Sequence, residues 1–157
     1  MVYKTKGVIL KKQDYKEADG LYVFYTKDFG KVSLVARGAK KIASKLAGHL
    51  DYFQEVNLTF ATGKAFDQIS GAVVNKNFNS LKLDYDRINL GFEFLGLLDQ
   101  AVREHDRDEK IYEFIINVFN YLDTQKDLNF NFTRKAFMKK LGILIGAGDK
   151  LKEFLEK

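Results

Sequence analysis

The spacing of the apolar residues changes once along the chain, near residues 75–80, and this change limits the folds that are possible. Before it, apolar and polar residues alternate with the period of half-buried strands, as in residues 55–60. After it, apolar residues recur every three or four positions, as expected for helices that bury one face. The pattern predicts an α+β protein with two domains, one of strands at 1–78 and one of helices at 79–157.

Five segments of the N-terminal half have strand character, because they are rich in β-branched and aromatic residues or alternate in polarity. The second and third are separated by Lys27-Asp28-Phe29-Gly30, where the glycine can adopt positive φ without steric cost. We expect these two strands to form a hairpin. Thr62-Gly63-Lys64 is a further turn signal. The expected strands lie around residues 8–10, 21–26, 31–36, 55–60 and 66–74.

A short amphipathic helix is expected between the third and fourth strands, because Ile42, Leu46 and Leu50 recur at four-residue spacing. Five strands with one helix inserted there is the order of an OB-fold, a small Greek-key barrel. Such barrels bind single-stranded nucleic acid with basic residues for the phosphates and aromatic residues for the bases. The prediction is therefore a five-stranded OB-fold barrel followed by an all-α domain.

The stretch 30–50 contains five basic residues and no acidic residue. Residues 1–80 contain 13 Lys and Arg against 7 Asp and Glu, whereas residues 81–157 contain 13 against 14. A surface with charges of one sign attracts a polyanion, so the N-terminal half is predicted to bind nucleic acid. The five basic residues are Lys31, Arg37, Lys40, Lys41 and Lys45.

The predicted site is centred on Arg37-Gly38-Ala39-Lys40-Lys41, for which a solvated surface loop is the alternative explanation. The glycine lets the backbone approach a phosphate, Arg37 can hold a phosphate through two donors, and the lysines act as point charges. Lys4, Lys6, Lys11 and Lys12 flank the first strand and could extend the basic stripe. The full predicted set is Lys11, Lys12, Tyr15, Phe29, Lys31, Arg37, Lys40, Lys41 and Lys45.

Aromatic residues of the same half are candidate platforms for base stacking, although core packing is the expected role for any single one of them. By alternation, Tyr22 and Phe24 share one face of their strand and Tyr25 lies on the other, but the pattern leaves open which face is the core. The candidates are Tyr15, Tyr22, Phe24, Tyr25 and Phe29.

Three other polar residues are assigned structural roles. Glu17 and Asp19 cannot contact phosphate favourably, so they are expected to stabilise a loop or contact a protein partner. His49 lies between Gly48 and Leu50 and is expected to pack and form hydrogen bonds rather than to bind a ligand.

The C-terminal half is predicted to contain three helices and a last short amphipathic turn that begins at Asp149. Asp84 and Asp108 begin the first two helices and Thr133 is expected to cap the third. Gly91 and Gly96 suggest close helix contact in the first. The expected inward-facing residues are Ile88, Phe92, Leu95, Leu98 and Val102, then Ile111, Phe114, Ile115, Val118, Phe119 and Leu122, then Phe137, Leu141 and Leu144.

Several classes of function are excluded or disfavoured by the sequence. There is no cysteine, which removes thiolate nucleophiles, disulfides and Cys-ligated zinc, and no glycine-rich nucleotide-binding motif occurs. Glu104, His105, Asp106 and Asp108 are nearly adjacent and read as a solvated helix end rather than a metal site. We expect a protein that is not an enzyme and needs no cofactor. Without a signal peptide or a membrane-spanning segment, it is expected to be soluble and cytoplasmic.

Short motifs follow one another in roughly the first 75 residues: Gly7-Val8-Ile9-Leu10, Asp14-Tyr15, Glu17-Ala18-Asp19, Phe29-Gly30-Lys31, Arg37-Gly38-Ala39-Lys40-Lys41, Ser44-Lys45-Leu46, Gly48-His49-Leu50 and Phe53. This ordered set resembles the N-terminal domain of the RecO family, bacterial recombination mediators that anneal DNA strands. In the helical half, Phe137 followed by Lys140-Leu141, Leu144 and Gly146 resembles the segment before the zinc module of that family.

The resemblance implies an OB-fold that binds single- and double-stranded DNA and promotes annealing of complementary strands. It also implies partnership with RecR and with the C-terminal tail of single-stranded-DNA-binding protein, for which no residues are assigned. Many RecO proteins continue with a four-cysteine zinc site, whereas this chain has no cysteine and ends at Lys157, so a compact member without that module is expected.

Two alternatives to a DNA-binding mediator remain open from the residues. The basic face could meet an acidic protein partner, which would make the chain an adaptor. OB-folds also accept RNA, so an RNA-binding barrel is the third hypothesis.

Overall fold

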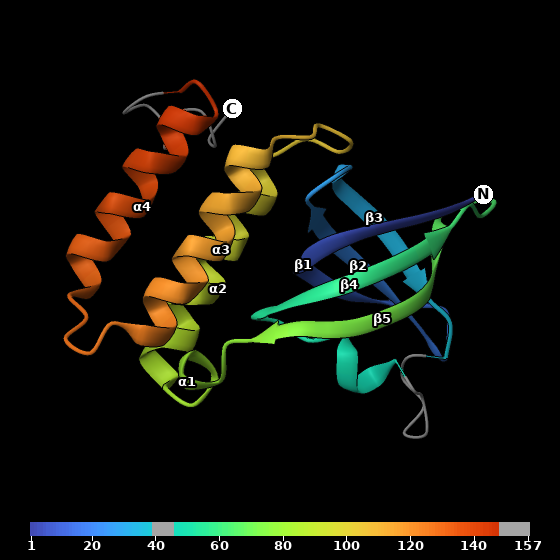
Figure 1. Ribbon diagram of the computed structural model, residues 1–157, viewed down its shortest axis with the longest axis horizontal. Coiled ribbons are helices and arrows are strands. Elements are labelled where there is room, and N and C mark those ends of the chain that lie inside the picture. Colours follow the sequence, from blue (N-terminus) through green and yellow to red (C-terminus); the bar gives the residue numbers. More distant parts are fainter. Residues whose placement is uncertain (39–45, 148–157) are drawn as a thin grey trace. The chain divides into compact units, whose positions relative to one another are not determined.

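The computed structural model of the chain describes residues 1–38 and 46–147 (Figure 1). These residues form two compact units. The first consists of Met1–Asn77 together with the short segment Glu104–Arg107, and the second of Phe78–Arg103 with the residues that follow Arg107.

The first unit is a closed barrel of five strands in the order β1-β2-β3-β5-β4 (Figure 1). All neighbouring strands are antiparallel except β3 and β5, which pair in parallel. This order is that of an OB-fold and confirms the predicted fold class. The strands are β1 (Val2–Tyr15), β2 (Asp19–Thr26), β3 (Gly30–Ala36), β4 (Gln54–Ala61) and β5 (Asp67–Asn77).

Strand β1 is much longer than the apolar run at 8–10 predicted. Its first part, from Val2 to Gly7, pairs with β4, and the part from Gly7 to Tyr15 pairs with β2 across a bulge between Ile9 and Lys11. One strand therefore belongs to two pairs, which closes the barrel. The residues on either side of the apolar run are mostly polar, although their exposure largely alternates as in a strand with one solvent-facing side. Their composition therefore did not indicate that they extend β1.

The barrel interior is filled by alternate residues of all five strands, including Phe24, Leu34, Val56, Leu58 and Phe60. The predicted hairpin is confirmed, because Thr26 lies opposite Gly30 and Gly30 has a φ of +66°. A side chain at this glycine would also place its Cβ 2.5 Å from the main-chain oxygen of Asp106. Backbone conformation and packing therefore each require glycine here.

Both faces of β2 are buried, so Phe24 and Tyr25 have the packing role expected for any single aromatic residue of this half and are not stacking platforms. Phe24 lies in the interior and Tyr25 on the outer face, yet both are 0 % exposed. The segment Glu104–Arg107 covers this part of the outer face: Tyr25 Oη donates to Asp106 O at 3.4 Å and Ser33 Oγ donates to Glu104 Oε1 at 2.8 Å. A contact between residues about 80 positions apart cannot be read from local alternation.

The predicted helix between β3 and β4 is a single 3₁₀ turn, Ala47–His49, over the part that the structure describes. Its first half, with Ile42, lies outside the described residues. Leu46 and Leu50 pack against the barrel interior. His49 Nδ1 accepts a hydrogen bond from Val74 N at 3.2 Å, which confirms the packing and hydrogen-bonding role expected for this histidine.

The second unit contains helices, of which α3 and α4 lie side by side in Figure 1. The predicted starts at Asp84 and Asp108 are confirmed, since both side chains accept hydrogen bonds from main-chain N–H groups of their helices. The described helices are α1 (Asn79–Lys82), α2 (Tyr85–Ala101), α3 (Glu109–Thr124) and α4 (Phe130–Leu144).

The prediction that Thr133 caps the third helix is wrong. Asn129 is the cap, because its side chain accepts from Phe132 N at 3.0 Å. Thr133 is buried inside α4, and its Oγ1 donates to Asn129 O at 2.7 Å. Asn and Thr are both favourable caps, so the sequence pattern alone did not separate them.

Part of the predicted inward face of α2 is also wrong. Phe94, Leu95 and Leu98 are buried, whereas Phe92 is 43 % exposed, and a side chain at Gly96 would meet nothing within 4 Å. Near residues 75–80, where the apolar spacing changes, β5 ends at Asn77 and is followed by Phe78, which is 0 % exposed and packs on Phe119. The turn expected from Asp149 lies outside the described residues.

No helix in the described part of the chain is long and apolar enough to cross a membrane.

Candidate nucleic-acid interface

Two turns of the barrel meet through a pair of aromatic rings. Tyr15 ends β1 at the β1–β2 turn, and Phe66 ends the β4–β5 loop. Their rings are edge to face, with centroids 5.5 Å apart and an interplanar angle of 86°. Both residues are partly exposed. In OB-folds these two loops flank the surface that binds oligonucleotides.

Arg37 is linked to this aromatic pair by Gln68, one of the first residues of β5. Arg37 is exposed directly after β3, and Gln68 lies two residues after Phe66. With the Gln68 amide oriented so that its oxygen faces Arg37, that oxygen accepts from Arg37 Nη2 at 3.0 Å and Nε at 3.3 Å. A guanidinium has five donors, so Arg37 is held in place while the others stay available to an anion.

The carboxylates of this region hold its loops. Asp19 Oδ1 accepts from Gly38 N at 2.8 Å, and Asp67 Oδ1 accepts from Gly63 N at 3.2 Å. The hydrogen bond of Asp19 confirms that this residue has a loop-structural role. Gly63 must be glycine, because a Cβ there would lie 2.0 Å from Phe66 O. The acids therefore fix the turns that present Arg37 and Phe66.

We call the surface formed by Tyr15, Lys16, Arg37, Phe66 and Gln68 the Tyr15–Arg37 surface. Lys16 is exposed in the β1–β2 turn with a φ of +54°, and its Nζ lies 5.5 Å from the centroid of the Tyr15 ring. The surface therefore combines two cations with two partly exposed rings, the combination that binds phosphates and bases of a single strand.

The remaining predicted residues are not all at this surface. Lys11 is exposed on β1 opposite Val23. Lys12 Nζ forms an ion pair with Asp51 Oδ1 at 3.0 Å and lies 4.8 Å from the Tyr52 ring centroid, so part of its charge is compensated. Lys40, Lys41 and Lys45 lie outside the described residues.

Phe29 and Lys31 lie at the other end of β3 from Arg37. The Phe29 ring is partly buried, 5.4 Å from the Tyr3 ring and 5.7 Å from the Phe60 ring, both edge to face. Lys31 O accepts from His105 N at 2.9 Å. Six residue steps along a strand span about 20 Å, so these two residues are well separated from the Tyr15–Arg37 surface.

Lys16, Phe66 and Gln68 are at this surface but were not predicted from the sequence. The turn around Gly63 was recognised, but its approach to the β1–β2 turn depends on pairings that are not local. A usable signal did exist, because OB-folds use these two loops, and here the first contains Tyr15-Lys16 and the second contains Lys64 two residues before Phe66.

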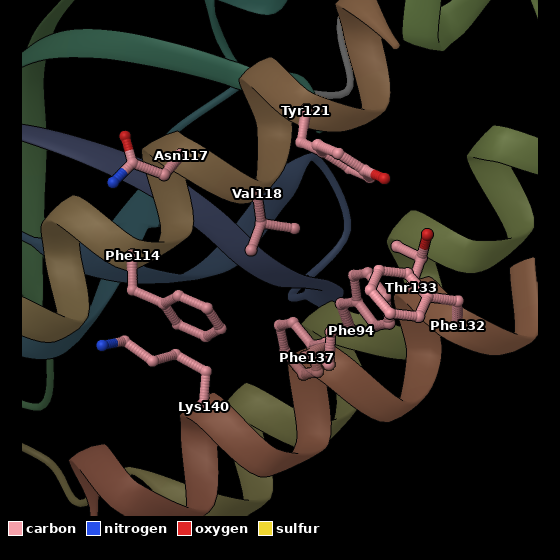
Figure 2. Close-up of a pocket in the computed structure, with 10 residues that line it drawn as sticks. Phe94, Phe114, Asn117, Val118, Tyr121, Phe132, Thr133, Phe137 and Lys140 are labelled. Atoms are coloured by element: carbon pink, nitrogen blue, oxygen red, sulfur yellow. The ribbon is translucent and has the colours of Figure 1, made fainter. Parts of the chain in front are cut away.

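The helical unit contains an apolar groove of about 300 Å³ (Figure 2). Phe94 and Phe137 stack in its wall with centroids 3.8 Å apart, and Phe132 on its rim is 64 % exposed. Figure 2 shows the Lys140 side chain beside the Phe114 ring at the edge of the groove.

No group of three or more potential metal ligands occurs among the residues that the structure describes. Glu104, one of the residues weighed as a ligand from sequence, instead accepts a hydrogen bond from Ser33. His105 Nε2 lies 3.8 Å from Glu104 Oε2, on the exposed side of the same segment.

The barrel order and the two meeting turns define the first unit as an OB-fold domain. The sequence profile for the N-terminal domain of recombination protein O matches residues 1–78. The chain is 33 % identical over 147 residues to the DNA repair protein RecO of Clostridium novyi (strain NT), covering 94 % of this chain and 57 % of that protein. The chain belongs to the RecO family.

Other relatives agree with this assignment. The chain is 30 % identical over 141 residues to DNA repair protein RecO of Listeria welshimeri, covering 90 % of this chain and 55 % of the relative. It is 30 % identical over 122 residues to that of Roseiflexus sp. (strain RS-1), covering 78 % and 43 %. The chain spans about half the length of the curated relatives it matches.

Proposed function

We propose that this chain acts in DNA repair as a recombination mediator that binds single- and double-stranded DNA and promotes annealing of complementary strands. The Tyr15–Arg37 surface carries the proposal, because it places cations and rings together where OB-folds bind nucleic acid. The names of the relatives, DNA repair protein RecO, favour DNA as the polyanion. The proposed site of action is the cytoplasm.

The proposed mechanism contains no chemical step. Arg37 binds phosphate, and Lys40, Lys41 and Lys45 follow it closely in the sequence and add positive charge. Tyr15 and Phe66 offer ring surface to bases without selecting among them. Neutralised phosphates repel each other less, so two complementary strands held by the protein can approach and pair.

A salt series tests this proposal. The affinity for a fluorescent single-stranded oligonucleotide is measured by anisotropy for the wild type, for Arg37→Glu, and for Lys139→Glu as an exposed-lysine control on α4. We expect log affinity to fall linearly with log salt, with a slope of about −0.7 per phosphate contact. Arg37→Glu should bind at least tenfold more weakly at low salt than the control. Equal affinities of the two variants would contradict the site.

The choice between DNA and RNA needs its own measurement. Parallel titrations with DNA and RNA strands of the same sequence would show tighter binding of DNA if the mediator function is right. Tighter binding of RNA would favour the alternative of an RNA-binding barrel.

We also propose a second function, as an adaptor that binds the acidic tail of single-stranded-DNA-binding protein in the groove of the helical unit. The groove wall is apolar and could bury an apolar side chain, and Lys140 at its edge suits a carboxylate of an acidic tail. Partnership with RecR is proposed from the family resemblance alone.

A tail peptide labelled with a fluorophore tests the adaptor function. Lys140→Glu and Phe132→Ala should each weaken peptide binding several-fold while leaving DNA affinity unchanged. Displacement of DNA by the peptide would instead place the acidic partner on the barrel, as the basic-face adaptor hypothesis requires.

A further inference from the structure

A basic cleft lies on the barrel, away from the Tyr15–Arg37 surface. It has a volume of about 420 Å³ and lies on the outer face of β1 and β4, beside the β2–β3 turn. Its polar lining includes the three lysines Lys4, Lys6 and Lys27, together with Asn57, Thr59 and Asp28. The three lysines are exposed.

Strand register explains why these side chains share one face. Lys4 lies opposite Thr59, and Lys6 lies opposite Asn57, in the antiparallel pair of β1 and β4. Residues opposite each other in such a pair point to the same side, and Lys4 and Lys6 are two residues, or about 6.6 Å, apart. Tyr3, between Val2 and Lys4, points the other way into the barrel core.

The cleft has an excess of positive charge. Asp28 is the one acidic residue of the lining that the structure describes. It is already engaged, because Asp28 Oδ2 accepts from Thr5 Oγ1 at 2.8 Å and Thr5 Oγ1 accepts from Asp28 N at 3.2 Å. Within residues 1–38 and 46–147, no ion pair links Lys4, Lys6 or Lys27 to a carboxylate. Three cations therefore face one cleft with a single carboxylate, and an anion bound there would relieve their repulsion.

We propose that Lys4, Lys6 and Lys27 form a second binding site for a sugar–phosphate backbone. The inference rests on the proposed function, because it assumes that the polyanion is nucleic acid. The hydroxyl of Thr59 and the amide of Asn57 add the neutral donors that commonly contact phosphate oxygens. The described lining contains no aromatic ring, so this site contacts the backbone and offers no stacking to bases.

The second site is separate from the Tyr15–Arg37 surface. Lys27 lies in the turn before β3 and Arg37 directly after β3, and the strand between them spans about 20 Å. One barrel therefore has two places for a backbone, one with rings and one without. A protein that holds two strands at once brings them together without forming a dimer, which is a direct physical route to annealing.

Stoichiometry with short strands tests the second site. A single-stranded oligonucleotide of about ten nucleotides, within the range that one OB-fold covers, is titrated at low salt and the complexes are weighed by sedimentation. The variants are Lys4→Glu/Lys6→Glu, the milder Lys4→Ala/Lys6→Ala in case the first does not fold, and Arg37→Glu. Lys135→Glu/Lys139→Glu on α4 has the same change of charge as the first variant and is the control.

We expect two strands per chain for the wild type and the control, and one for either Lys4/Lys6 variant. The salt slope of the variants should also fall by about 1.4, because two phosphate contacts are lost. One strand per wild-type chain, lost in Arg37→Glu and kept in the Lys4/Lys6 variants, would overturn the second site and leave the proposed function intact. Failure of the wild type to bind any strand would defeat both.

An arm with a polyglutamate peptide separates nucleic acid from an acidic protein partner. If the Lys4/Lys6 variants lose the peptide while their strand stoichiometry stays at two, the cleft is a protein-binding site and the inference is wrong. If polyglutamate binds equally to the variants and the control, the nucleic-acid assignment is strengthened.

Discussion

The two ends of β3 have cations of the same basic stretch, yet they differ in what surrounds them. At the first end, Lys31 O accepts from His105 N, and the neighbouring Ser33 donates to Glu104. At the second end, Arg37 is exposed and held by Gln68 beside two rings. A run of basic residues in the sequence is therefore not one surface, because a segment some 70 residues later covers part of it.

The largest expected effect comes from a substitution at Gly30, at the end of β3 that Glu104–Arg107 covers. We call this the covered end. Gly30→Ala should lower the free energy of unfolding by about 2 kcal/mol or more, since a non-glycine residue at positive φ is strained. Its Cβ would also lie 2.5 Å from Asp106 O and 2.9 Å from Arg107 N, which are main-chain atoms that cannot rotate away. Urea denaturation followed by circular dichroism measures the change.

Gly71→Ala is the matched control on the same barrel. A Cβ at Gly71 would lie 3.7 Å from Thr59 Cβ, an ordinary contact, so its unfolding free energy should change by less than about 0.5 kcal/mol. Equal losses for the two variants would show that Glu104–Arg107 does not constrain the covered end.

The next largest effect should distinguish the two ends in binding. Arg37→Ala is expected to weaken single-strand binding about tenfold, or about 1.4 kcal/mol, because an exposed phosphate contact is lost. Lys31→Ala should change the affinity by less than about twofold, since Lys31 lies at the covered end and apart from the rings. Anisotropy titrations in one buffer compare them, and a larger loss for Lys31→Ala would reverse our assignment of the two ends.

Much of the fold could be predicted from the sequence, because local patterns determine it. Alternation in β4, the glycine of the β2–β3 turn and the aspartates that start α2 and α3 are signals within a few residues of the structure they produce. The faces of β2 could not be predicted. Tyr25 is buried by a segment that follows α2 in the sequence, and no local pattern contains that information.

The candidate site was predicted only in part, for the same reason. Arg37 and Tyr15, which lie at the candidate surface, were predicted from charge and from aromatic character, which are properties of single residues. Phe66 and Gln68 matter because β5 pairs in parallel with β3 at Leu34 and Val35, and this pairing brings a distant loop to Arg37. The lysines at 4 and 6 were read as an extension of one stripe, whereas strand register places them in a separate cleft.

A smaller effect should test whether carboxylates hold the loops at the Arg37 end of β3. Asp19→Ala removes the acceptor for Gly38 N, so we expect a loss of about 1 kcal/mol in stability and a two- to threefold weaker DNA affinity. The sign is informative, because removal of a negative charge near phosphate would by itself strengthen binding. Glu17→Ala removes an exposed acid from the same turn and should strengthen binding slightly. Stronger binding in both variants would mean that Asp19 acts through its charge alone.

The smallest expected effect concerns the phenol of Tyr22, which is partly buried and packs against the barrel core. Burial, and then the charges of Asp51 and Tyr52, raise the pKa of the Tyr22 phenol above its ordinary value of 10.0. The folded protein therefore holds the proton more tightly than the unfolded chain. This contribution to stability is complete below pH 10 and is lost as the pH rises from there through the raised pKa.

Urea denaturation between about pH 8 and pH 11 should show the sign of this effect. The wild type is expected to lose stability above pH 10 more steeply than Tyr22→Phe, by at most about 1.4 kcal/mol per pH unit for one proton. If Tyr22→Phe instead lost stability as steeply as the wild type, burial of this phenol would not resist its ionisation, and its environment in the folded protein would be open to water.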